Sequence, residues 1–116
     1  MKSPTIAPAY AGLYAGLCEA AREHGYCLAI HGSLTNDMDV VAIPWTDNAS
    51  DSETLAYALW ARVNWLGRDK QPVKGEAKPH GRMSWFFPLL QAAPGEGRSG
   101  IDLSVMPRLL PPADQG

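Results

Sequence analysis

The chain has 116 residues, a length that suits one domain with its own core and not two independently folded domains. Apolar residues make up 46% and charged residues 19%, a composition typical of a folded globular protein and not of a disordered chain. The 10 basic and 12 acidic residues give a formal net charge of -2. No overall positive field therefore attracts the chain to nucleic acid, and any phosphate-binding surface must be local.

Cellular location and domain organisation follow from the same survey. No apolar run approaches the roughly 18 to 20 residues of a membrane span, and the first residues lack the pattern of a signal peptide, so we expect a cytoplasmic protein without membrane contact. Cys18 and Cys27 lack the spacing of zinc ligands, which favours two reduced thiols. The chain is predicted to form a single domain over 1–116, with a core over about 7–108 and a flexible tail over 109–116.

The first half of the chain predicts one helix and two strands. Apolar residues recur at helical spacing over 10–21, and Gly25 follows as a helix stop. Short segments rich in branched apolar residues then predict strands over 26–30 and 38–43. The turn residues between them predict that these two strands are neighbours joined by a tight loop.

A second helix is the most regular pattern in the sequence. Ser50 and Glu53 form a capping box, and one apolar face continues from there to Gly67. The segment over 68–81 contains two prolines and two glycines among charged residues, which predicts a long exposed loop or an irregular edge.

The last third of the chain predicts two further strands, over 83–90 and 101–106, with a turn over 92–100. The predicted element order is α, β, β, α, β, β. This order favours an α+β fold, with a small mixed or antiparallel sheet of about four to five strands and two helices on one face.

Three carboxylates stand out because of their positions in these strands. Asp37 and Asp39 lie two positions apart, so both side chains project from one face. Like charges this close disfavour each other's ionisation unless a metal, a basic partner or open solvent offsets them. On a neighbouring strand, Asp102 would complete a set of hard oxygen ligands suited to Mg²⁺ or Mn²⁺. The alternative is that these aspartates are an ordinary turn residue or solvent-facing polar residues of a strand. This alternative fits Asp37 better than Asp39 and Asp102, because apolar residues flank Asp39 and Asp102.

The segments HGSLTNDMDVVAIP and GIDLSVMP resemble the signature of the nucleotidyltransferase superfamily, and DMDV and IDLSVMP are similar to strands of the DNA polymerase beta palm. The resemblance implies a minimal nucleotidyltransferase-like fold in which Gly32 and Ser33 hold the triphosphate of a nucleotide. It implies that Asp37 and Asp39 bind two divalent ions, Mg²⁺ or Mn²⁺. Asp102 would bind one ion and act catalytically, helping a hydroxyl of an unknown acceptor to attack while pyrophosphate leaves.

The resemblance has one departure, because only the three residues 34–36 separate Gly32-Ser33 from Asp37, fewer than in the superfamily. From about Tyr10 to Arg108 the chain also resembles small bacteriophage and prophage proteins with HGS, DxD, HGR and IDLSVMPR segments in this order. That likeness implies the cytoplasm of a bacterial host and no established function. The alternative to a Mg-dependent enzyme is therefore a non-catalytic phage or prophage module that keeps the fold for nucleotide binding or protein interaction.

Basic residues are concentrated in one segment. Between Arg62 and Arg82 there are six basic and two acidic residues, a local charge of +4. Beside an acidic metal site, such a segment favours binding of a metal-complexed phosphate, with Arg82 and Lys78 as phosphate ligands. The alternative is a solvated loop with ordinary surface charges.

Two histidines are further candidates for the site, and the sequence also suggests which ligand and partners the protein has. His31 lies directly before Gly32 and His80 directly before the HGR arginine, so both are accessory candidates for proton transfer or phosphate contact. A nucleotide is the expected ligand, and the net charge does not favour nucleic acid. A homodimer or a protein partner is the expected source of the acceptor-binding part, since 116 residues leave no room for a second domain.

Overall fold

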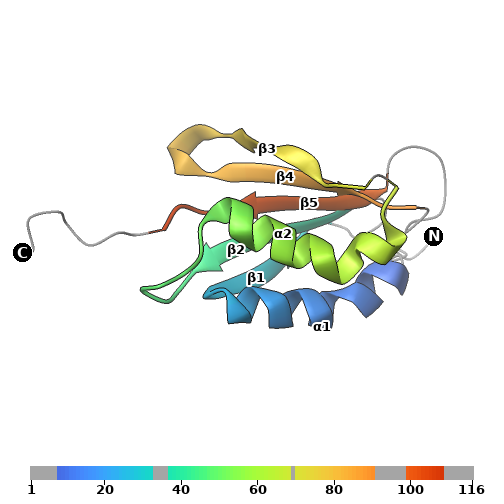
Figure 1. Ribbon diagram of the computed structural model, residues 1–116, viewed down its shortest axis with the longest axis horizontal. Helices are drawn as coiled ribbons and strands as arrows, with labels where there is room; N and C mark the ends of the chain where they lie inside the picture. Colours follow the sequence, from blue (N-terminus) through green and yellow to red (C-terminus); the bar gives the residue numbers. More distant parts are fainter. Residues whose placement is uncertain (1–7, 33–36, 69, 91–98, 109–116) are drawn as a thin grey trace, which may run out of the picture.

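A computed structural model describes residues 8–32, 37–68, 70–90 and 99–108. Within these residues it contains two α-helices, five strands and two short 3-10 turns (Figure 1). In chain order they are α1 (Pro8–Glu23), β1 (Tyr26–His31), β2 (Asp37–Pro44), α2 (Ser52–Val63), η1 (Asn64–Leu66), β3 (Val73–Ala77), η2 (Pro79–Gly81), β4 (Met83–Pro88) and β5 (Gly100–Val105). The predicted tail over 109–116 and most of the predicted turn over 92–100 lie outside the described residues.

The strands form one sheet in the order β1-β2-β5-β4-β3. Neighbouring strands are antiparallel except β2 and β5, which run parallel, so the sheet is mixed. Both helices lie on the same face of the sheet, and α1 packs against β1 and against α2 (Figure 1). The predicted α+β fold, with two helices on one face of a sheet of four to five strands, is confirmed.

The two faces of the sheet differ because successive residues of a strand point to opposite sides. Met38 and Val40 of β2 and Leu103 of β5 are at most 1% exposed and belong to the core beneath the helices. Asp39 and Asp102 alternate with them and therefore point to the opposite face. We call this second face, which neither described helix covers, the open face.

The connections of the two helices explain one confirmed and one wrong prediction. Gly25 ends α1 with a φ of +84°, a left-handed conformation that favours glycine. The N-cap of α2 is Asp51 and not the predicted Ser50, because the Asp51 carboxylate accepts a hydrogen bond of 2.8 Å from the Thr54 N–H. The Ser50 hydroxyl lies 2.8 Å from Nδ1 of His24 instead, so it ties the two helix ends together.

Two predicted boundaries also differ from the structure. The α-helix α2 ends at Val63, and the apolar pattern continues to Leu66 only as the 3-10 turn η1. The segment 68–81, predicted as a loop or irregular edge, contains the edge strand β3 and the turn η2. The pairing of β3 shifts register between Val73 and Glu76, so this bulged, polar strand lacks the regular alternation by which a strand is recognised.

The helices pack together through an arginine of the basic segment. Arg62 of α2 donates to the carboxylates of Glu19 and Glu23 of α1 at 3.1 and 3.0 Å, and to the carbonyl of Gly16 at 3.4 Å. This cation therefore serves the helix pair and lies on the side away from the open face. Neither α1 nor α2, the helices of the described part of the chain, is long and apolar enough to cross a membrane.

Candidate functional site

Three of the predicted site residues lie in one row across the open face. The antiparallel register pairs His31 of β1 with Asp39 of β2, and the parallel register pairs Asp39 with Asp102 of β5. Paired residues point to the same face, and the strands that carry them are about 4.8 Å apart. We call His31, Asp39 and Asp102 the acidic row. Its two carboxylates, Asp39 and Asp102, lie 63 residues apart in the sequence.

Asp37 lies on the same face, two residues before Asp39 and opposite Gly100 of β5. Over residues 8–32, 37–68, 70–90 and 99–108, no three His, Cys, Asp or Glu side chains form a group that could hold a metal ion. The structure thus aligns Asp39 with Asp102 as a pair of carboxylates. The predicted role of Asp37 as a third ligand stays a prediction.

Gly32, which has no side chain, leaves space for the carboxylate of Asp39. The φ of Gly32 is +81°, and a Cβ built on it would lie only 2.6 Å from Oδ2 of Asp39. A side chain at this position would therefore meet both an unfavourable backbone conformation and the carboxylate itself. The Asp39 carboxylate thus occupies the space that a side chain at position 32 would need. Ser33 lies outside the described residues, and its phosphate contact stays a prediction.

Arg82 reaches the open face from the residue before β4. Its Nη1 donates to Oγ of Ser104 at 3.3 Å. Ser104 follows Asp102 by two residues in β5, so both share a face, and Ser84 of β4 lies opposite it. Sequence reasoning missed Ser104 and Ser84, although the alternation of IDLSV places the serine on the same face as the aspartate.

Lys78 and His80 lie at the turn between β3 and β4. The Lys78 ammonium forms an ion pair of 3.4 Å with Glu76, and its backbone N–H bonds to the carbonyl of Arg82. His80 is exposed in η2 with a φ of +68°, next to Gly81, whose φ is also positive. Arg82, which ends this turn, lies four residues before Phe86 of β4, and Phe86 is opposite Asp102. Neither side chain belongs to the acidic row.

Tyr10 of α1 is a buried neighbour of the site that sequence reasoning assigned only to the helix core. Its hydroxyl accepts a hydrogen bond of 3.1 Å from the N–H of Gly100, the residue paired with Asp37. Burial raises the pKa of Tyr10, and the negative charges of Asp37 and Asp39 raise it further. The phenol therefore stays neutral and connects α1 to the start of β5.

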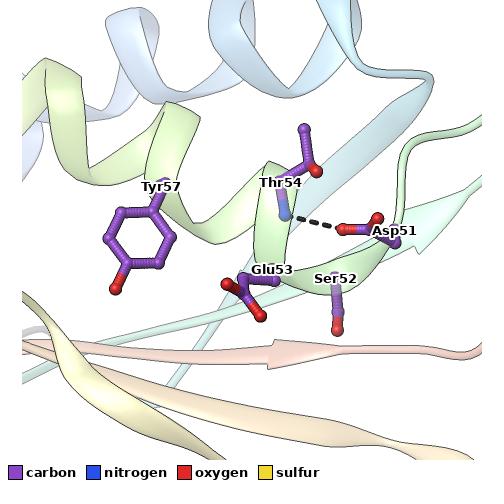
Figure 2. A pocket seen from close by; sticks show the side chains of 5 residues that line it. All are labelled: Asp51, Ser52, Glu53, Thr54 and Tyr57. Atoms are coloured by element: carbon purple, nitrogen blue, oxygen red, sulfur yellow. Dashed lines mark hydrogen bonds between the residues drawn. The ribbon is translucent and has the colours of Figure 1, made fainter.

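A hollow of about 650 Å³ contains no residue of the acidic row; Figure 2 shows the side chains that line it. It is lined entirely by residues at the start of α2, on the helix side of the sheet: Asp51, Ser52, Glu53, Thr54 and Tyr57. Hydrogen bonds from Thr54 lower the pKa of Asp51, because the carboxylate caps the helix. This hollow brings together no groups of the predicted site.

The described part of the chain has a mixed five-stranded sheet with both helices on one face, and Asp39 is aligned with Asp102 on the parallel strand pair. A structure of the Cid1 poly(U) polymerase with Mg and 3′-dATP bound is similar to the chain, with a TM-score of 0.51 and 16% identity. The match covers 84% of this chain and 30% of that one, so the chain spans less than a third of the polymerase. At this identity the likeness establishes the fold alone.

Comparisons by sequence add nothing to this likeness. No model of a protein family matches the chain, and a search of curated proteins finds no match. The resemblance to phage and prophage proteins therefore has no support beyond the segments that suggested it.

Proposed function

We propose that the acidic row binds a nucleoside triphosphate together with Mg²⁺ or Mn²⁺ and transfers its nucleotidyl group to a hydroxyl of an acceptor. The observation that carries the proposal is the parallel register that pairs Asp39 with Asp102 on the open face. Two carboxylates at one strand spacing repel each other, and a bound cation would relieve that repulsion.

The donor set of the acidic row suits a hard divalent cation. Mg²⁺ commonly takes one or two protein carboxylates and completes its shell with phosphate oxygens and water. Asp39 and Asp102 would be those carboxylates, with Asp37 on the same face as the third proposed ligand. A bound Mg²⁺ would supply charge neutralisation at the phosphates and at the leaving group.

The proposed transfer is a displacement at phosphorus. The oxygen of the acceptor hydroxyl forms a bond to the α-phosphorus, and the bond from that phosphorus to the bridging oxygen breaks, so pyrophosphate leaves. Asp102 accepts the proton of the hydroxyl, since a carboxylate of the acidic row is a base within reach of an acceptor on the open face. His31, beside Asp39, is the accessory candidate for moving a proton.

Phosphate groups of the two reactants, the nucleotide and the acceptor, would be held by backbone and by positive charge. Gly32 permits a phosphate to approach the backbone closely, and Ser33 would donate its hydroxyl. Arg82 supplies a guanidinium on the open face, where Ser104 fixes it. We assign Lys78 a weaker contribution because Glu76 already pairs with it, and His80 only a contact from the edge of the site.

The polymerase neighbour supports a nucleotide as the ligand, because that enzyme holds Mg and 3′-dATP in its structure and is selective for UTP. We propose a second copy of this chain or a protein partner as a source of contacts to the acceptor. The proposed setting is the cytoplasm of a bacterium, in a phage or prophage context, as the sequence segments suggest.

The second candidate is a non-catalytic module that captures a nucleotide or a protein partner. The observation in its favour is the segment of three residues between Ser33 and Asp37, which leaves little chain to surround a triphosphate. Binding without transfer would distinguish this module from the enzyme.

Calorimetric titration with each common nucleoside triphosphate, with Mg²⁺ and with a chelator, tests the binding. Asp39→Asn and Asp102→Asn keep the shape of the side chain and remove its charge, so we expect each to weaken binding by about tenfold or more. Asp47→Asn is the matched control, because Asp47 is exposed in the turn after β2, at the opposite end of that strand. It should bind within about twofold of the wild type.

Release of pyrophosphate with a panel of hydroxyl acceptors then separates the two candidates. Release that depends on Asp102 supports the transferase, whereas Mg-dependent binding without release across the panel supports the capture module. If no nucleotide gives a saturable signal, or Asp39→Asn binds as well as the wild type, the metal and nucleotide site is refuted.

A further inference from the structure

The Asp39–Asp102 pair has two chemically different sides. On the side of Asp39 lie the edge strand β1 and Gly32, whose missing side chain leaves the space that the carboxylate occupies. On the side of Asp102 lie Ser104 and the guanidinium of Arg82. The guanidinium is held at Ser104 of β5, two strand spacings or roughly 10 Å from β1. Ser104 lies two residues beyond Asp102 in the direction away from Gly32, so the guanidinium and Gly32 are offset both across and along the sheet. This offset favours two separate phosphate groups over one phosphate chain that contacts both.

Arg82 has hydrogen-bonding capacity to spare. A guanidinium carries five N–H donors, and the contact with Ser104 uses one of them. The ion pairs among the described residues join Arg62 with Glu19 and Glu23, and Lys78 with Glu76, so Arg82 takes part in none of them. Its side chain is half-buried and fixed over a polar strip of the open face. A fixed guanidinium of this kind suits an oxyanion with several acceptor atoms.

We propose that Arg82, positioned by Ser104, binds a phosphate group of the acceptor and not of the nucleotide donor. The proposal rests on the proposed function, since it assigns the two sides of the acidic row to the two reactants. With its phosphate on Arg82, an acceptor would place its hydroxyl beside Asp102, the proposed base, because Ser104 and Asp102 are alternate residues of β5.

The acceptor in this arrangement is a small phosphate ester such as a nucleoside monophosphate. A nucleic acid strand would need a row of cations, and the chain carries a net charge of -2 with Lys78 engaged by Glu76. One guanidinium next to two carboxylates selects a single phosphate at a fixed distance from the reacting hydroxyl.

The test measures two affinities in the full chain. The first is that of a non-hydrolysable ATP analogue with Mg²⁺, and the second is that of AMP added after this analogue is saturating, with adenosine as the uncharged comparison. Arg82→Gln removes the charge, Arg82→Lys keeps it without the fork, and Arg22→Gln, in the exposed last turn of α1, is the matched control. Thermal unfolding checks that each variant is folded.

We expect AMP to bind alongside the analogue, and adenosine at least about tenfold more weakly. Arg82→Gln should weaken the binding of AMP roughly 10-fold to 100-fold, Arg82→Lys should weaken it less, and Arg22→Gln should change it by less than about twofold. The affinity for the ATP analogue should stay nearly constant in all three variants.

Competition between AMP and the analogue, or an equal loss of both in Arg82→Gln, would assign Arg82 to the nucleotide and overturn the inference while the proposed function stands. Tighter, Arg82-dependent binding of a short oligonucleotide than of AMP would replace the small ester by a strand end. Absence of binding for the non-hydrolysable analogues of all four common nucleoside triphosphates would refute the proposed function and the inference together.

Discussion

Replacement of Gly32 by alanine tests whether this glycine makes room for the Asp39 carboxylate. The new methyl group would lie 2.6 Å from Oδ2 of Asp39, at a backbone φ of +81°. Either the carboxylate turns away or the turn after β1 shifts, so the acidic row loses its geometry in both cases. The variant should therefore lose Mg-dependent nucleotide affinity as well as stability.

The expected cost has two parts. A residue with a Cβ in the left-handed region costs about 1 to 2 kcal/mol, and forcing the Asp39 side chain off its rotamer costs about 0.5 to 1.5 kcal/mol. The lower entropy of an unfolded chain with alanine returns about 0.4 to 1 kcal/mol. We expect a net loss in the free energy of unfolding of about 2 kcal/mol for Gly32→Ala.

Urea denaturation of a double-mutant cycle separates the two parts. In an Asp39→Ala background the carboxylate is absent, and Gly32→Ala should cost only about 1 kcal/mol. Gly12→Ala is the control, because Gly12 lies in α1 with no atom near its Cβ position, and alanine there should stabilise by about 0.5 to 1 kcal/mol. An equal cost of Gly32→Ala in both backgrounds would refute the proposed contact between Gly32 and Asp39.

Three further predictions concern the helices. Hydrogen bonds from Thr54 lower the pKa of Asp51, so the Asp51 carboxylate stabilises the fold above its ordinary pKa of 3.8 and this stabilisation is lost at lower pH. Asp51→Ala should therefore lower the free energy of unfolding in urea by about 1 kcal/mol near neutral pH and by less below pH 3.8. A hydrogen bond with Cys18 and burial raise the pKa of Tyr14 from 10.0 to about 12. The neutral Tyr14 phenol therefore contributes its full stabilisation of the fold below pH 10.0, and this stabilisation is lost as the pH rises towards 12. In an ultraviolet titration, Tyr14→Phe should remove the ionisation of one tyrosine near pH 12. Arg62→Gln should cost about 1 kcal/mol at low salt and less at high salt, compared by thermal unfolding, and an unchanged difference would argue against an ionic contribution.

Local sequence patterns predicted those elements whose conformation depends on their own residues and not on distant parts of the chain. Gly25 ends α1 because its left-handed φ belongs to the residue itself, and Met38 and Val40 alternate with the aspartates because the strand is pleated. The N-cap at Asp51 could not be predicted in the same way, because the hydroxyl of Ser50 is engaged by His24, in the turn that follows α1.

The candidate site was only partly predictable. That Asp37 and Asp39 share a face follows from the sequence, but the pairing of Asp39 with Asp102 depends on which strands become neighbours and in which direction. The contact between Arg82 and Ser104 likewise joins residues that only the packing of β4 against β5 brings together. Such pairings come from the packing of the whole sheet, which no short segment encodes.

The position of β5 has a consequence for how the protein folds. β5 comes last in the chain order of the described strands, yet it lies in the middle of the sheet, between β2 and β4. Contacts between segments so far apart in sequence form slowly, because a long loop must close before they stabilise the chain. Until β5 inserts, β2 and β4 present two unpaired strand edges, and Asp39 has no partner carboxylate. We therefore expect assembly of the acidic row to be a late event in folding, and a chain in which β5 has not yet inserted would be open to pairing with strands of other molecules.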